Sequence, residues 1–505
     1  MLKISKTLFI FLNALFLTLL NTSAFIFVAK HLESTFLAFA LALCYFCLLY
    51  ILLNICFIKF LTKFLSILFV VSAAFSVYFM SSYGILIDSD MILNVMQTDT
   101  KEASELFNAS LIFVGIACAV FAYFVFKVKI KKDSISKRIL SSCIALVLAL
   151  AVFLPLTKTY VPFFRNYNIA RMYNTPFYQF YAVYRYYQRF VKEQPDFQNI
   201  ANDATLQNTQ KKLLVLVVGE TARAENYSLG TYTNNNTNFY TKQTNAVFFD
   251  NFFSCGTSTA ISLPCMFSLS KKNDFKTTEY QENVLDVLQK AGVSVSWYGN
   301  NSGGCKGVCD RISDTKMLKL PFDESLLEPF KTKLDNLKDQ NIIVLHLQGS
   351  HGPTYYKRYP NTFKKFLPTC ETNELAKCSQ ESLINTYDNT LLYTDFILAE
   401  IINSLQQKTE YKTALLYVSD HGENLGENGI YLHGMPYVFA PKEQTHIPTI
   451  FWSNDTQLMQ LATEHKSLKL SHDNLFSTIL GFFKVSTKEY LIQDDFLNRT
   501  LKEKS

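Results

Sequence analysis

Five long apolar stretches fill the first third of the chain. The first four contain 21 to 25 residues and the last contains 19, and charged residues lie only beyond their ends; the stretches are Thr7–Ala29, Ser34–Ile58, Phe64–Ile87, Leu106–Phe126 and Ile139–Thr157. About 20 apolar residues cross a bilayer as a helix. One such stretch is also compatible with a buried core helix, but five in succession predict five transmembrane helices. No small-residue cleavage pattern follows the first stretch, so we expect it to be an uncleaved helix rather than a signal peptide.

The Lys and Arg residues between these stretches predict how the helices are oriented. With the N-terminus in the cytoplasm, the cytoplasmic segments carry ten Lys and Arg residues, and the short loops on the other side carry only Lys30 and Lys101. Positive side chains are concentrated in cytoplasmic loops. Five spans that start inside leave the large C-terminal part outside, which in a Gram-negative cell is the periplasm.

Two further segments accompany the predicted membrane part. In residues 88–105, on the outer side, Asn94, Thr98 and Glu102 fall on one face of a helix, and the spacing alone favours a polar face exposed to water. Residues 160–190 are rich in Tyr and Arg, which favours a helix or a pair of helices at the membrane–water interface over an ordinary core helix. Polar residues 192–212 are predicted to be a linker.

The remaining three hundred residues alternate between short apolar runs and amphipathic segments. The runs are Leu213–Val218, Val293–Trp297, Ile342–Leu347, Ala414–Val418 and Thr449–Trp452, and helical patterns such as Glu282–Ala291 and Ser382–Leu405 separate them. This alternation predicts a mostly parallel sheet with helices on both faces. In such sheets, functional residues gather at the carboxyl ends of the strands.

Composition and charge narrow the class of protein. Hydrophobic residues make up 49% of the chain and charged residues only 18%, which excludes a disordered chain and argues against a wholly soluble one. The net charge of +6 belongs entirely to the first 160 residues, which hold 13 Lys and Arg against 7 Asp and Glu. The C-terminal part is therefore neutral overall, and we expect no nucleic-acid partner.

Candidate metal ligands follow the predicted strands. Glu220 comes after one strand, and Asp420 and His421 come after another; five of the eight histidines lie between His346 and His446. Carboxylates and imidazoles suit Zn²⁺ or Mn²⁺, although a single histidine is more often an ordinary core or loop residue. The clustering at strand ends favours a metal site.

The segment from Cys255 to Cys265 (CGTSTAISLPC) combines a Gly/Ser/Thr-rich turn with the start of a helix. Such a turn presents backbone N–H groups to an anion. Its hydroxyls could cap the helix or, next to a metal, serve as a nucleophile.

The cysteines also divide with the predicted topology. Five lie in or near the apolar stretches, and six lie in the C-terminal part as close sequence pairs: Cys255 and Cys265, Cys305 and Cys309, Cys370 and Cys378. Three local disulfides are the simplest arrangement and suit an oxidising compartment. A zinc site built from cysteines is the alternative.

Together these motifs resemble the lipid A phosphoethanolamine transferases of Gram-negative inner membranes, the group that includes the transferable polymyxin-resistance enzymes. The resemblance covers nearly the whole chain in order. It rests on NVMQTD, VVGETARAENYSL, SCGTSTAISLPCMFS, CKGVCD, VLHLQGSHGPTYYKRYP, NTYDNTLLYTDFI, YVSDHGENLGENGIYLHGMPY and APKEQTHIP. It implies a membrane domain of five helices (1–157), bridging helices and a linker (158–205) and a zinc-dependent catalytic domain of the alkaline phosphatase/sulfatase type (206–505).

The resemblance also assigns roles to individual residues. Zinc would be held by Glu220, Thr259, Asp420 and His421, with a second zinc possible, and Thr259 would be the nucleophile. His351 and His433 match histidines that contact the phosphate or a second zinc. His346 and Lys306 match further pocket positions, and Asn94, Thr98 and Glu102 match residues that hold the head group of the lipid donor.

The implied reaction transfers phosphoethanolamine from phosphatidylethanolamine to lipid A or another periplasmic acceptor through a phosphoethanolamine-threonine intermediate. Such a product lowers the negative charge of the cell surface, which would confer resistance to cationic peptides. The expected protein is a monomer that also contacts membrane lipid.

Three other functions are compatible with parts of the sequence to different extents. A sulfatase needs a C/S-x-P-x-R context, whereas Thr259 is followed by Ala-Ile-Ser, so it is rejected. A glycerol-phosphate transferase of the lipoteichoic acid synthase type shares five spans and a Thr nucleophile. A non-catalytic membrane-anchored binding protein would be expected to have lost some of these ligands.

Overall fold

The chain divides into two compact units, each described here by itself. The first comprises residues 1–92 and 107–185, and the second comprises residues 93–106 and 186–505. The computed structural model describes residues 3–58, 60–192, 195–207, 210–277 and 280–498.

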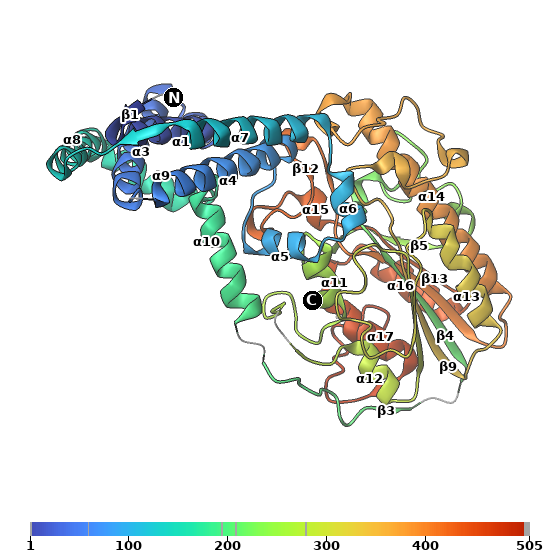
Figure 1. The fold of residues 1–505 in the computed structure, drawn as a ribbon. Helices are drawn as coiled ribbons and strands as arrows, with labels where there is room; N and C mark the ends of the chain where they lie inside the picture. The colour runs from blue at the N-terminus through green and yellow to red at the C-terminus, as the bar shows by residue number, and fades with distance from the viewer. Residues whose placement is uncertain (1–2, 59, 193–194, 208–209, 278–279, 499–505) are drawn as a thin grey trace. The chain divides into compact units, whose positions relative to one another are not determined.

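The first unit is helical, and its long helices follow the predicted apolar stretches (Figure 1). Among the described residues, four helices are long and apolar enough to cross a membrane, or five if a pair bent by 52° is one span. The long helices are α3 (Thr35–Cys56), α4 (Leu61–Tyr83), α7 (Ala109–Lys127) and α8 (Ile135–Phe153), and the bent pair is α1 (Lys6–Leu20) with α2 (Thr22–Leu32).

The bend in the first predicted span occurs at Asn21. The Asn21 amide donates to the carbonyls of Leu17 and Thr175, both at 2.8 Å, and its side-chain oxygen accepts from the Thr175 N–H at 2.9 Å. A side chain that bonds to backbone groups inside a helix competes with the helical ladder and bends it. Hydropathy alone reports apolar length, so it does not reveal such a break.

The segment rich in Tyr and Arg forms the expected pair of helices, α9 (Thr157–Asn166) and α10 (Phe177–Tyr186). Tyr160 is fully buried, and its hydroxyl donates to the Leu37 carbonyl at 2.6 Å. The ring of Phe177 lies 5.4 Å from that of Phe69 in α4. Much of this segment is therefore packed against the long helices of its own unit.

The second unit is built on a seven-stranded sheet with the order β5-β13-β10-β4-β9-β7-β8. The five predicted strands are all present, and β13 runs antiparallel to β10. Two short strands at the sheet edges, β5 and β8, were not predicted. The bounds are β4 (Lys212–Gly219), β5 (Val247–Phe249), β7 (Ser294–Gly299), β8 (Asp314–Met317), β9 (Gln340–His346), β10 (Lys412–Ser419) and β13 (Thr449–Ser453).

Helices cover both faces of this sheet (Figure 1). One face carries α11 (Thr259–Phe267), α12 (Val284–Lys290), α16 (Thr456–His465) and α17 (Leu475–Phe483), and the other carries α13 (Leu327–Leu334) and α14 (Gln380–Gln406). The segment 93–106 holds the end of α5 (Ser89–Gln97) and α6 (Thr100–Glu105).

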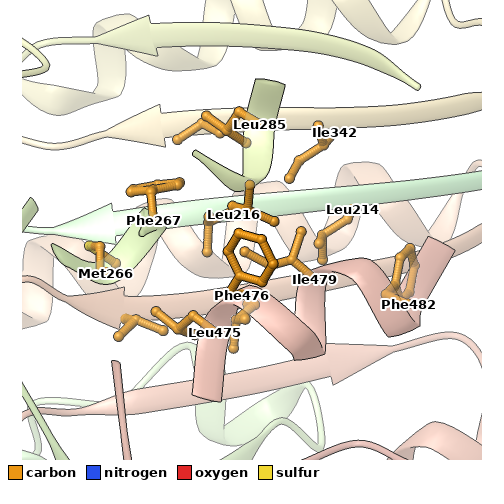
Figure 2. Packing of buried hydrophobic residues seen from close by; sticks show 14 of the residues in the cluster. Leu214, Leu216, Met266, Phe267, Leu285, Ile342, Leu475, Phe476, Ile479 and Phe482 are labelled. Atoms are coloured by element: carbon orange, nitrogen blue, oxygen red, sulfur yellow. The ribbon is translucent and has the colours of Figure 1, made fainter. Parts of the chain in front are cut away.

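Alternation along the central strand β4 explains the two layers. Leu214 and Leu216 join the core shared with α11, α12 and α17, whereas Leu213 and Val215 join the core shared with α13 and α14. Figure 2 shows the first of these cores, in which Phe476 and other side chains of α17 pack over Leu216. Successive side chains of a strand point to opposite faces, so an apolar run of this kind is buried on both sides.

The residues predicted to form a linker are partly attached to the second unit. Thr205–Leu206 pairs with Val485–Ser486 as a two-stranded sheet, and Ala201 is buried in the core beside α12 and α17. The Ile200 N–H donates to the Glu282 carboxylate at 2.8 Å. A polar composition predicts exposure but does not report such backbone pairing.

Candidate active site

The predicted metal ligands meet at the carboxyl ends of neighbouring strands. Strand β4 lies between β10 and β9, so Glu220 after β4 is next to Asp420 and His421 after β10. All three residues are buried, and one ligand atom from each lies within 4.8 Å of the others. His421 Nε2 is 3.4 Å from both a Glu220 and an Asp420 carboxylate oxygen.

Thr259 lies in the same cluster because it begins helix α11. Its hydroxyl is 3.0 and 3.1 Å from the two carboxylate oxygens of Glu220 and 3.3 Å from His421 Nε2. The first turn of α11 has no side-chain cap from Ser258. The Gly/Ser/Thr turn therefore places the Thr259 hydroxyl against the carboxylate and imidazole groups.

The chemistry of this cluster fits a divalent cation. Asp420 Oδ2 is buried and has no hydrogen-bond partner. The His421 Nδ1 faces the Gly422 carbonyl at 2.9 Å, which leaves Nε2 as the atom facing the carboxylates. One imidazole, two carboxylates and a hydroxyl form an oxygen-rich set suited to zinc.

The pKa values also reflect an uncompensated negative charge. Burial and, next to it, the neighbouring Glu220 carboxylate together raise the pKa of Asp420 to about 7. Burial opposes charge on His421, but Asp420 and Glu220 outweigh it and raise its pKa to about 10. A bound cation would supply the positive charge that the proton on His421 otherwise supplies.

Two of the predicted histidines border this cluster. The ring of His433 is 4.3 Å from that of His421 and 5.7 Å from that of His351. His433 Nδ1 lies 3.4 Å from the Glu423 carboxylate. The rings of His421, His433 and His351 therefore lie side by side along one edge of the site.

Glu102 reaches this row of histidines from the segment 93–106. Its carboxylate is 2.5 Å from His351 Nε2. Burial disfavours charge on His351, but Glu102 outweighs burial and raises the pKa of His351 to about 9. Burial likewise opposes charge on Glu102, yet His351 lowers the pKa of that carboxyl to about 2. The pair is thus an imidazolium and a carboxylate at neutral pH.

Glu105 attaches the same segment to the domain. Its carboxylate pairs with the Arg358 guanidinium and accepts from the Thr354 hydroxyl at 2.6 Å, and the Asn373 amide donates to its backbone carbonyl at 2.7 Å. The side chains of Glu105 and Arg358 are 8% and 6% exposed. Arg358 Nε also donates to the His351 carbonyl at 2.7 Å.

The other predicted pocket residues lie at different distances from the cluster. Lys306 Nζ donates to the Gln97 carbonyl at 3.3 Å; burial lowers the pKa of Lys306, which Glu102 and Glu220 oppose. His346 is fully buried, and neither of its ring nitrogens has a hydrogen-bond partner. The Thr98 hydroxyl donates to the Asn94 carbonyl at 2.8 Å.

Several residues of the site were not predicted from the sequence. The Asn301 amide donates to Glu220 at 2.7 Å, the Thr221 hydroxyl does so at 2.6 Å, and Glu423 faces His433. Glu423 stands three residues after Asp420, and Asn301 follows β7. Their position just beyond strand ends was the available signal.

The six cysteines of the second unit form the three local disulfides expected from their spacing. The bonded pairs are Cys255–Cys265, Cys305–Cys309 and Cys370–Cys378. The first disulfide encloses Thr259 and the second encloses Lys306. With their sulfurs bonded in pairs, these cysteines favour the disulfide arrangement over a cysteine-based zinc site.

Two family models match the chain. Residues 212–485 match the family described as sulfatase, which covers the sheet and its helices. Residues 45–190 match the family described as phosphoethanolamine transferase EptA/EptB, which covers most of the first unit.

Individual proteins also match the chain, two of them over most of its length. The phosphoethanolamine transferase EptA of Escherichia coli K12 is 40% identical over 86% of this chain and 84% of its own. The integral membrane lipooligosaccharide phosphoethanolamine transferase A of Neisseria meningitidis has 32% identity and a TM-score of 0.92, over 99% of this chain and 100% of its own. The periplasmic domain of the Campylobacter jejuni phosphoethanolamine transferase EptC has 67% identity and a TM-score of 0.60, over 61% of this chain and 99% of its own.

Proposed function

Because the chain belongs to the phosphoethanolamine transferases, we propose that it transfers phosphoethanolamine from phosphatidylethanolamine to lipid A or to another periplasmic acceptor. The N. meningitidis relative is named for lipooligosaccharide, and the C. jejuni domain is described as periplasmic. The first unit spans the inner membrane, and the second works in the periplasm, where its three disulfides are stable.

The residues that would hold zinc are Glu220, Thr259, Asp420 and His421. They fit because the cluster joins buried carboxylates, an imidazole and a hydroxyl and leaves Asp420 Oδ2 without a partner. Zinc, when bound, acts as a Lewis acid on a phosphoryl oxygen and lowers the pKa of a coordinated hydroxyl.

The first displacement uses Thr259 as the nucleophile. A bond forms between Thr259 Oγ1 and phosphorus, and the bond from phosphorus to the glycerol oxygen breaks. The Thr259 hydroxyl proton passes to water, while His351 donates a proton to the departing glycerol oxygen. His351 suits this role because Glu102 keeps it protonated.

The second displacement resets the site. An oxygen of the acceptor bonds to the same phosphorus and the bond to Thr259 Oγ1 breaks. The neutral His351 takes up a proton, from the acceptor where its oxygen is a hydroxyl or otherwise from water, and the threonine oxygen takes a proton from water. Lys306 compensates the negative charge of the phosphoryl group during both steps, and the protonated His351 does so until it donates its proton. The product carries an added amine, which reduces the negative charge of the outer surface and weakens the binding of cationic peptides.

The observation that carries this proposal is the Thr259 hydroxyl, 3.0 Å from Glu220 and 3.3 Å from His421. A glycerol-phosphate transferase would use the same cluster with a different donor. The relative with 40% identity is a phosphoethanolamine transferase, which favours phosphatidylethanolamine. A non-catalytic binding protein would have no need for a hydroxyl among the metal ligands.

Intact-protein mass spectrometry tests the proposal. The purified chain with zinc and phosphatidylethanolamine, but no acceptor, is expected to gain the mass of one phosphoethanolamine at Thr259. Thr259→Ala should gain no mass. Thr257 lies in the same turn, and its hydroxyl donates to the Met435 carbonyl; Thr257→Ala should still be modified. An adduct formed only with phosphatidylglycerol would replace the proposal by the glycerol-phosphate alternative, and no adduct with either lipid would refute it.

A further inference from the structure

A separate cavity opens beside the nucleophile within the second unit. It has a volume of about 240 Å³. Its lining includes Ala260, which directly follows Thr259, and Pro264 one turn later on the same face of α11. Lys306 also lines it, and the charge of Lys306 interacts with Glu102 and Glu220 of the transfer site. The cavity and the transfer site therefore share a wall.

The walls of this cavity combine polar and apolar groups. Besides Lys306, they carry the charged or amide side chains of Gln97, Glu282, Asn283, Asp310 and Arg311, together with apolar side chains that include Leu93, Phe275 and Val308. Acyl chains gain nothing from charged and amide groups, which lose hydration when apolar atoms cover them. A group that bears hydroxyls and a phosphate, by contrast, can pair with amides and cations.

Arg311 is the cation best placed to recognise a phosphate here. Its guanidinium donates through Nε and Nη2 to Asp286, at 2.9 and 2.7 Å. This bidentate pair fixes the plane of the guanidinium, and the side chain is still 34% exposed. A planar guanidinium held in this way is pre-organised for phosphate oxygens.

We propose that this cavity is the acceptor subsite, which receives a phosphorylated sugar and brings its oxygen to the phosphoethanolamine on Thr259. The inference rests on the proposed function, since it assigns a place to the second substrate of the same reaction. On this proposal the donor's glycerol and acyl chains bind outside the cavity, and so Arg311 governs the second displacement but not the first.

The two displacements can be measured separately on the full-length chain. In the first stage, the zinc-loaded protein reacts with phosphatidylethanolamine, and intact mass follows formation of the adduct. In the second stage, the purified adduct is mixed with lipid A in detergent micelles, and intact mass follows its discharge. Arg311→Gln is expected to form the adduct at the unaltered rate and to discharge it at least about tenfold more slowly, the effect of losing one charge-assisted hydrogen bond.

Two further variants separate recognition from a general loss of charge. Arg311→Lys keeps a cation and should restore part of the discharge rate. Lys271 lies outside the cavity and forms an ion pair with Asp494 at 2.8 Å. Lys271→Gln removes one positive charge and this ion pair, and should discharge the adduct at the unaltered rate.

Each outcome has a distinct meaning. If Arg311→Gln slows formation of the adduct rather than its discharge, the cavity serves the donor and the inference is wrong. If Arg311→Gln discharges the adduct as fast as the unaltered protein, the inference is also wrong, while the proposed function stands. If the unaltered protein forms no adduct, the proposed function fails, and this inference fails with it.

Discussion

The ion pair between Glu105 and Arg358 is expected to control donor binding, although neither side chain belongs to the metal cluster. The pair attaches the segment 93–106, which carries Glu102, to the rest of the second unit. Substitution of Glu105 by Gln removes the negative charge and leaves the Arg358 guanidinium, which is 6% exposed, without its partner.

The size of the effect follows from burial. Removing one partner of a buried ion pair costs about 3–5 kcal/mol because the remaining charge is left uncompensated. Since about 1.4 kcal/mol corresponds to a factor of ten, the docked state of the segment should lose a factor of roughly 100 to 1000 or more. We expect the apparent affinity for phosphatidylethanolamine to fall accordingly, because Glu102 leaves its place beside His351.

The assay is the rate of adduct formation on Thr259 as a function of phosphatidylethanolamine concentration in mixed micelles. Glu105→Gln should raise the KM for the donor strongly. The double variant Glu105→Leu/Arg358→Met should raise the KM for the donor no more than Arg358→Met alone, because it leaves no buried charge without a partner. Glu371→Gln breaks an exposed ion pair with Lys364 and should change little.

Two results would refute this reasoning. One is an unaltered KM in Glu105→Gln, which would mean that the segment does not depend on the ion pair. The other is strict additivity of the two single substitutions in the double variant, which would mean that Glu105 and Arg358 are not coupled.

Three further predictions concern acid–base chemistry, metal and core. Because Glu102 holds the pKa of His351 at about 9, adduct formation should fall as the pH rises through that value. In Glu102→Gln the carboxylate is gone, and burial then lowers the pKa of His351. The fall in rate with rising pH should therefore begin at a lower pH in this variant. An unshifted profile would exclude His351 as the acid. Removal of zinc with a chelator should abolish adduct formation, and zinc should restore it; a chelated protein that still reacts would contradict the ligand assignment. Leu216 is fully buried on β4, in the core shared with α17. Leu216→Ala should destabilise the second unit by about 2–5 kcal/mol, measured as a lower unfolding temperature. The same substitution at Leu491, which is 38% exposed, should not lower the unfolding temperature in this way.

The sequence allowed the main architecture to be predicted because its signals are local. Apolar length identified the membrane helices, and the short apolar runs that precede Glu220 and Asp420 identified the central strands. Parallel order then placed these residues at one edge of the sheet. The edge strands β5 and β8 were missed because β5 has only three residues and the four residues of β8 are mostly polar, and both patterns are too weak to predict a strand.

Contacts between distant parts of the chain could not be predicted in this way. Spacing placed Asn94, Thr98 and Glu102 on one helix face and favoured exposure to water, yet Glu102 lies 2.5 Å from His351. The pairing of Glu105 with Arg358 joins residues 253 positions apart. Nothing in the local periodicity of either segment reports such a partner, and the bend at Asn21 likewise depends on Thr175, 154 residues away.

In the proposed reaction, phosphoethanolamine passes through Thr259 on its way to the acceptor. A pulse–chase experiment with phosphatidylethanolamine labelled in its head group tests it most directly. Label should first appear on the peptide that contains Thr259 and then move to added lipid A, with loss from the protein as fast as gain by the lipid. Two results would exclude the threonine intermediate. One is label that reaches lipid A at the full rate without ever residing on the protein, and the other is transfer of label to lipid A at the full rate by Thr259→Ala.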